Sequence, residues 1–172
     1  MKKFIVIMLV ILSIGGMYYF SSQDGKVSGS QSQVVVNIID KVRDKVTLKN
    51  QKLIKVQTKV YDKLRKIGTK SYIVRKIAHF IIYGLIGISL LLFIYIFSKK
   101  LILSSIMAFI LSITYACYDE YRQISIPGRS GSIKDIFIDS CGALTGIVLS
   151  FGIILIVKFI MSKTKNKKES VI

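Results

Sequence analysis

A cluster of polar residues in the second half of the chain has the side chains that chemistry requires. Between Tyr118 and Asp139, carboxylates, an amide and basic residues fill a gap between two strongly apolar segments. The residues of interest are Asp119, Glu120, Gln123, Arg129, Asp135 and Asp139. Carboxylates can act as general acids or bases or bind hard cations, and arginine can hold a phosphate. Because buried charge is costly, the cluster must be hydrated or internally paired.

A second polar set lies at the start of the preceding apolar segment. Arg75, His79 and Tyr83 are spaced at i, i+4 and i+8, so they share one face of a helix. His79 is the sole histidine of the chain. Together with a carboxylate of the first cluster it offers a general acid and base.

Four apolar runs predict transmembrane helices. They cover residues 4–20, 77–97, 101–118 and 136–160, and each is long enough to cross a bilayer. A hydrophobic content of 52% in 172 residues exceeds what an ordinary soluble domain shows. We therefore predict an all-α fold, an integral membrane bundle of four transmembrane helices.

The connector between the first two spans is strongly basic. In residues 21–76, fourteen Lys or Arg against four Asp leave a charge of +10, out of +17 for the chain. Its Ser- and Gly-rich opening predicts a solvated, loosely ordered stretch. From about residue 33 to 67, apolar residues recur at spacings of three and four, which predicts one or two amphipathic basic helices. Such helices either lie on anionic headgroups or pack on the protein's own loops.

The same charge pattern predicts the topology. The basic residues Lys2, Lys3, Lys99 and Lys100 and the basic tail mark cytoplasmic segments, so both termini are expected in the cytoplasm. The predicted organisation is a membrane anchor (1–20), an extracytoplasmic connector (21–76), a three-helix membrane core (77–160) and a cytoplasmic tail (161–172). Since long uncharged runs separate the basic blocks, nucleic-acid binding is not expected.

This topology brings the polar residues of three spans to one outer boundary. Asp139 lies about one turn inside an apolar run, where a carboxylate needs a partner such as Arg129 or His79. Gly142 and Gly146 form a GxxxG pair that permits close helix approach. Pro127 and Gly128 break the helix, so the intervening loop can fold back over the site.

Three sequence segments resemble the VanZ-like family of bacterial membrane proteins. They read FSSQDGKVS, RKIAHFIIYGLIG and DEYRQISIPGRSGSIKDIFIDSCGALTG, and the similarity extends from about residue 20 to 146. The resemblance implies a role in the bacterial cell envelope, and the founding member is associated with resistance to the glycopeptide teicoplanin. It also implies that seven residues match recurring polar positions of the family: Arg75, His79, Tyr83, Glu120, Gln123, Arg129 and Asp135.

Three functions remain open at this stage. The polar site could bind or shield anionic lipids or envelope polymers at the outer leaflet and so lower glycopeptide susceptibility. It could instead belong to a membrane-embedded enzyme that acts on a lipid-linked envelope precursor through His79, Glu120, Arg129 and Asp135. It could also be an ion-pair network that fixes helix ends. The spacing matches no zinc hydrolase, so we assign no metal ligand, and the sequence identifies no cofactor and no oligomeric state.

Overall fold

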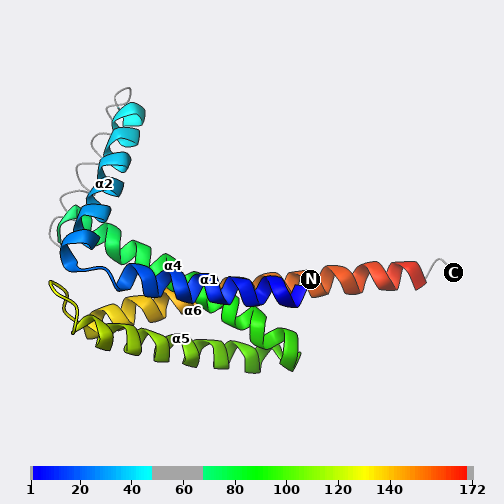
Figure 1. Cartoon of the computed structure of the whole chain (residues 1–172). Coiled ribbons are helices and arrows are strands. Elements are labelled where there is room, and N and C mark those ends of the chain that lie inside the picture. Colours follow the sequence, from blue (N-terminus) through cyan, green and yellow to red (C-terminus); the bar gives the residue numbers. More distant parts are fainter. Residues whose placement is uncertain (1, 48–67, 170–172) are drawn as a thin grey trace.

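The computed structural model describes residues 2–47 and 68–169, and within these residues the fold is entirely helical (Figure 1). The helices are α1 (Lys2–Ser21), α2 (Gly25–Thr47), α4 (Lys70–Ser98), α5 (Leu101–Gln123) and α6 (Ile133–Glu169). The second half of the predicted amphipathic segment lies outside the described residues. The prediction of an all-α protein is confirmed.

Four of the helices are long and apolar enough to cross a membrane, as predicted. These spans are Lys3–Ser21, Lys70–Ser98, Leu101–Gln123 and Ile133–Thr164. Their outward faces carry large apolar side chains, such as Ile102 and Phe137, which are about 70% exposed. Such a surface suits hydrocarbon and not water, because a lipid-facing helix needs no polar coat.

Helix α4 lies at the centre of the bundle and contacts α1, α2, α5 and α6. Its closest neighbour is α6, where the predicted GxxxG pair faces it. A β-carbon at Gly142 would lie 2.3 Å from the Phe80 carbonyl oxygen, and one at Gly146 would lie 2.1 Å from that of Gly84. The two backbones therefore touch directly, as glycine alone allows.

Helix α5 joins the bundle through a stripe of small side chains. Ser104, Ala108, Ser112 and Ala116 recur every four residues, and all are fully buried. The Ser104 and Ser112 hydroxyls donate to the carbonyls four residues earlier, so their polarity is satisfied within the helix. The turn from α4 into α5 uses Lys99 in the left-handed region (φ 56°), with its N–H donated to the Tyr95 carbonyl.

The start of the connector differs from its prediction. The Ser- and Gly-rich opening, residues 21–32, was expected to be loosely ordered, whereas α2 begins at Gly25. Asp24 caps the helix by accepting a hydrogen bond from the Val27 amide at 2.8 Å. Ser28, Ser32 and Val36 are buried at i, i+4 and i+8, so tertiary packing overrides the weak helix propensity of Ser and Gly. Figure 1 shows α2 leaving the bundle to one side.

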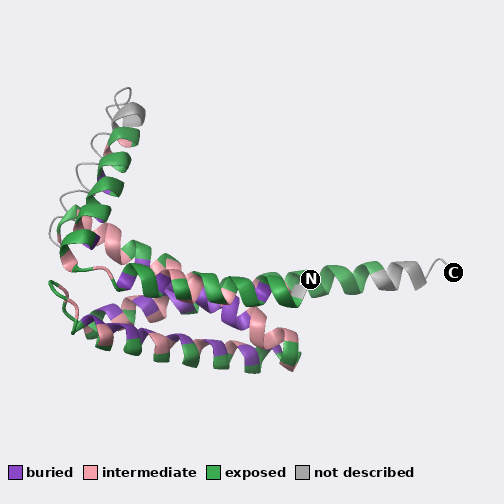
Figure 2. Ribbon diagram, in the orientation of Figure 1, coloured by how far each residue is buried: buried purple, intermediate pink, exposed green. Residues whose placement is uncertain are grey.

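The segment predicted as a basic tail, residues 161–172, is helical up to residue 169, because helix α6 runs on past the predicted end of the span at 160. No glycine or proline interrupts residues 153–169, so nothing in the sequence stops the helix. This part extends beyond the other helices, and its described side chains are exposed (Figures 1 and 2).

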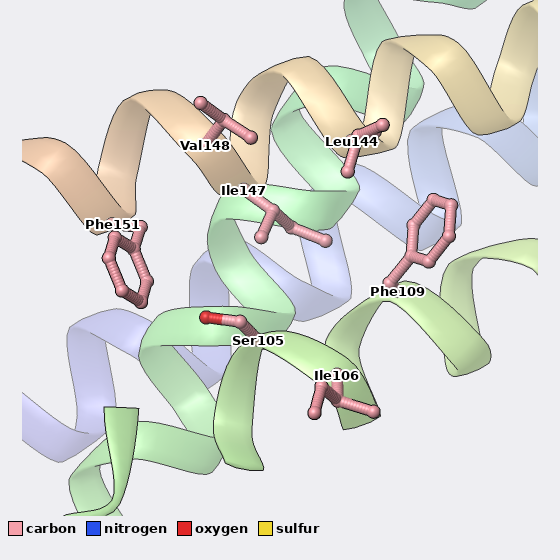
Figure 3. Close-up of a pocket in the computed structure, with 7 residues that line it drawn as sticks. All are labelled: Ser105, Ile106, Phe109, Leu144, Ile147, Val148 and Phe151. Atoms are coloured by element: carbon pink, nitrogen blue, oxygen red, sulfur yellow. The ribbon is translucent and has the colours of Figure 1, made fainter. Parts of the chain in front are cut away.

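An apolar groove of about 270 Å³ lies between α5 and α6, midway along the bundle (Figure 3). Its lining consists of Ser105, Ile106, Phe109, Leu144, Ile147, Val148 and Phe151. The lining is almost wholly apolar and includes no residue of the polar site, although Leu144 lies only about one and a half turns along α6 from Asp139. It therefore suits a lipid chain and plays no part in the polar site.

Candidate polar site at one end of the bundle

The polar residues gather where α1 and α5 end and α4 and α6 begin (Figure 1). The loop of residues 124–132 closes this end. Gly128 adopts φ 72°, a conformation that favours glycine, and the Gly25 amide donates to the Pro127 carbonyl at 3.0 Å. This bond ties the loop to the start of α2, so the loop does fold back over the site.

Asp119, which is 1% exposed, is fully paired by side chains from two helices. Its Oδ2 accepts from the Ser21 hydroxyl at 2.7 Å and from the Gln123 amide at 3.0 Å. Its Oδ1 accepts from Arg122 at 2.9 Å, and that guanidinium stacks over the Tyr18 ring at 4.2 Å. Asp119 therefore joins α1 to α5 and has a structural role.

Arg129 reaches from the loop to two other elements. Its Nη1 donates to the Gln123 side-chain oxygen at 3.3 Å, and its Nη2 donates to the Phe20 carbonyl at 3.0 Å. Burial lowers the pKa of the Arg129 guanidinium, and the like charge of Arg75 lowers it further. The two arginine charges therefore lie close enough to repel, and an anion between them would relieve that repulsion.

Asp135 is paired with Lys76 across α6 and α4. Its other oxygen is buried without a hydrogen-bond partner. Arg75, which precedes Lys76 in the chain, has no carboxylate partner among the residues that the structure describes. Its guanidinium lies 5.8 Å from the centre of the Tyr72 ring. Among the described residues, Arg75 and Arg129 are therefore the two basic side chains at this end whose charge no carboxylate neutralises.

His79 and Asp139 face each other across α4 and α6. The His79 Nδ1 lies 3.5 Å from the Asp139 Oδ1, and neither this nitrogen nor either Asp139 oxygen makes a hydrogen bond. Glu120 comes close from α5, so that donor atoms of His79, Glu120 and Asp139 all lie within 4.8 Å of one another. Glu120 itself accepts from the Ser132 amide at 2.9 Å and from Gln123 at 3.3 Å.

Two cavities meet at this end of the bundle. A polar chamber of about 180 Å³ is lined by Tyr72, Arg75, Lys76, His79, Gln123, Gly128, Arg129, Ser130, Ser132 and Asp135. A largely apolar groove of about 220 Å³ lies beside it and is lined by Met17, Phe20, Ser28, Gln31, Ser32, Val35, Val74, Arg75, Ala78, His79, Ile82 and Arg129. Arg75, His79 and Arg129 line both, so they mark the junction of a cationic and an apolar space.

Comparison with known proteins decides the family. The VanZ/LLP1 family model matches residues 4–158, which is most of the chain. The chain belongs to the VanZ-like family. No match was found among curated proteins or among solved structures.

The structure of this VanZ-like chain distributes the predicted polar residues over three groups. His79, Glu120 and Asp139 form a buried cluster, Asp119 and Gln123 form a bonded network, and Arg75, Arg129 and Asp135 line the chamber. Of the two partners predicted for Asp139, the structure selects His79, because Arg129 is held by Gln123 and Phe20. Tyr83 lies deeper, fully buried against Tyr115, with its hydroxyl unpartnered.

Three contributors to this end of the bundle were not among the candidate site residues predicted from the sequence. Ser21 bonds to Asp119, Arg122 pairs with Asp119, and Lys76 pairs with Asp135. Lys76 and Arg122 stand next to predicted residues and carry charge, so the need to neutralise buried carboxylates was a usable signal. Ser21 gave no such signal, because a serine after an apolar span is common.

Proposed function

We propose that this VanZ-like chain binds an anionic amphiphile, with a phosphate or similar group in the polar chamber and an apolar tail in the adjoining groove. The natural candidates are anionic lipids and lipid-anchored envelope polymers of the outer leaflet of the bacterial cytoplasmic membrane. Occupancy or shielding of these molecules would lower susceptibility to glycopeptides such as teicoplanin. The observation that carries the proposal is the junction of the two cavities at Arg75, His79 and Arg129.

Charge supports an anionic ligand. Arg75, Lys76 and Arg129 line the chamber, against one carboxylate, Asp135. Lys76 is already paired with that carboxylate, which leaves the two arginines facing the space. Arginine holds phosphate through two parallel hydrogen bonds, so two of them suit one headgroup.

Shape supports an amphiphile rather than a free anion. The groove beside the chamber presents Met17, Phe20, Val74 and Ile82 from α1 and α4, with Val35 from α2. An acyl or prenyl chain that leaves a headgroup held at Arg75 would enter this groove directly. A small inorganic anion would gain nothing from these apolar side chains.

Lipid retention tests this proposal. The full chain is purified in a mild detergent and its bound lipids are measured by native mass spectrometry. Arg75→Gln should reduce retention of anionic lipid, because a charge-assisted hydrogen bond contributes about 1.5–3 kcal/mol, or roughly 10- to 100-fold in affinity. Lys158→Gln is the matched control, since this exposed lysine lies over Tyr95 and far from the chamber. Equal retention by both variants and the parent would contradict headgroup binding at this site.

Antibiotic susceptibility tests the physiological part. Expression in a susceptible host should raise the inhibitory concentration of teicoplanin, and Arg75→Gln should return it to the vector level at equal protein abundance. If Arg75→Gln instead depletes the protein from the membrane, the charge fixes helix ends and the binding proposal is wrong.

The proposed orientation places the polar end outside and both termini in the cytoplasm. Lys3 lies over the Phe97 ring at 5.3 Å and Lys158 over Tyr95 at 5.1 Å, so basic residues of α1 and α6 gather near the basic turn after α4. Because the positive-inside rule is read from short loops, the tight basic turn at Lys99 and Lys100 favours a cytoplasmic location for this end, although the longer connector at the other end carries +10.

Thiol accessibility tests this orientation. In a chain without Cys117 and Cys141, Ser125→Cys should react with a membrane-impermeant reagent added outside intact cells, and Lys100→Cys should not. Reaction at position 100 alone would invert the topology.

One observation favours a second candidate, an enzyme that cleaves a lipid-linked envelope precursor. His79 lines the chamber and stands before two buried carboxylates, Glu120 and Asp139, which is an arrangement able to position and move a proton. Glu120→Gln should then abolish release of the headgroup from a lipid pyrophosphate while lipid retention persists. Retention without any release by the parent chain would leave binding as the function.

A further inference from the structure

Four carboxylates are buried at the polar end, and their partners differ. Asp119 is paired with Arg122, and Asp135 with Lys76. Glu120 (2% exposed) and Asp139 (1% exposed) have no lysine or arginine within ion-pair distance among the described residues. A single histidine, His79, lies between them and the chamber. Two buried carboxylates with one neutral or singly charged partner leave negative charge uncompensated.

The buried polar atoms without a hydrogen-bond partner indicate where a positive charge is needed. Both Asp139 oxygens and the His79 Nδ1 are buried and make no hydrogen bond. Buried polar atoms normally have a partner, so three orphans on two facing side chains need an explanation. Glu120, by contrast, is oriented by the Ser132 amide and by Gln123, as ligating carboxylates commonly are.

We propose that His79, Glu120 and Asp139 bind one divalent transition-metal cation, Zn²⁺ or Mn²⁺, between α4, α5 and α6. The ligand set of one imidazole nitrogen and two carboxylate oxygens suits these ions. The charge of the ion balances the two carboxylates that lack a basic partner.

The distances fit this assignment. Two ligands of a tetrahedral ion with bonds of 2.0–2.2 Å are about 3.4 Å apart. The His79 Nδ1 and Asp139 Oδ1 are 3.5 Å apart. This distance is long for a charged hydrogen bond but matches the separation expected between two ligand atoms of a tetrahedral ion. The third ligand atom, from Glu120, lies within 4.8 Å of both, so a small side-chain rotation closes the site. His79 also lines the polar chamber, which leaves a coordination position open to water or to a ligand oxygen.

This inference does not depend on headgroup binding, because metal content is measured without a lipid ligand. The full chain in nanodiscs is stripped with chelator, reloaded in separate arms with Zn²⁺ or Mn²⁺, desalted and analysed by mass spectrometry of the metal. About one ion per chain should be retained in at least one arm. Asp139→Asn and His79→Gln should each weaken binding by at least about 100-fold, since even outer-shell changes cost 10- to 100-fold.

The matched control is Asp119→Asn, which removes a buried carboxylate of the same end that is not a ligand. This variant should keep full metal binding, although it removes the negative charge that pairs with Arg122. Metal should also raise the unfolding temperature of the parent and of Asp119→Asn, but not that of Asp139→Asn. Absence of retained metal in both arms, or equal loss in Asp119→Asn and Asp139→Asn, would overturn the site.

Discussion

Substitution of Gly146 by alanine tests the link between helix packing and the polar site. A β-carbon at this position would lie 2.1 Å from the Gly84 carbonyl oxygen, whereas ordinary contacts begin at 3.4 Å. The obstacle is backbone on both sides, so no side chain can rotate away. Helices α4 and α6 would have to separate locally by about 1.3 Å, the difference between these two distances.

The energetic cost follows from this displacement. Overpacking of this kind costs about 1–3 kcal/mol, and a gap of 0.5–1 Å forfeits a quarter to a half of each dispersion contact along the interface. Alanine regains up to about 1 kcal/mol of helix propensity. Gly146→Ala should therefore be destabilising by roughly 1–2 kcal/mol. Because His79 and Asp139 lie on the same two helices, their 3.5 Å separation should also increase.

Gly152→Ala is the control for this prediction. Gly152 is on the same helix, and a β-carbon there meets nothing within 4 Å, so the substitution should be neutral or slightly stabilising. The assay is the fraction of detergent-solubilised protein that stays monodisperse after heating, measured across a temperature series. If Gly146→Ala is as stable as Gly152→Ala, the close approach of α4 and α6 is refuted.

Further predictions concern the connector and the ion pairs. The chain has no tryptophan, so Ile38→Trp introduces a single fluorescent probe on α2. Its fluorescence should be quenched more strongly by brominated lipids than that of Asn37→Trp, because the exposed apolar stripe of α2 should lie in the headgroup region. Equal quenching would mean that α2 stays in water. Lys76→Met should lower stability by about 3–5 kcal/mol, since it strands the buried Asp135, and adding Asp135→Asn should restore part of the loss in the same heating assay. Arg129→Lys should cost about 1 kcal/mol, because one ammonium cannot reach both acceptors of the guanidinium; unchanged stability would show that those hydrogen bonds contribute nothing.

Patterns within single segments predicted much of the fold. The four apolar runs fixed the number and type of spans, since length and composition alone decide whether a helix can cross a bilayer. The GxxxG pair of α6 predicted a close helix contact for a similar local reason. Two glycines one turn apart leave one face of the helix without side chains, and this is visible in the sequence. The glycines Gly142 and Gly146 indeed touch α4.

Local patterns failed where packing or pairing crosses between segments. The helical start of α2 was missed because Ser28 and Ser32 are stabilised by burial, which their own propensity does not reveal. The helical continuation of α6 to Glu169 was not predicted, because basic residues mark the end of an apolar span and not the end of a helix.

The sequence by itself determined that charged side chains would meet at one end of an apolar bundle, because spans of fixed length return polar ends to a common boundary. It did not determine which charged residues form ion pairs with each other. Only the tertiary structure shows that Arg122 pairs with Asp119 and that Lys76 pairs with Asp135. It also shows that His79, Glu120 and Asp139 face one another. The reason is that helix rotation and spacing, set by Gly142, Gly146 and the small side chains of α5, decide which groups approach within a few ångströms, and no single segment carries that information.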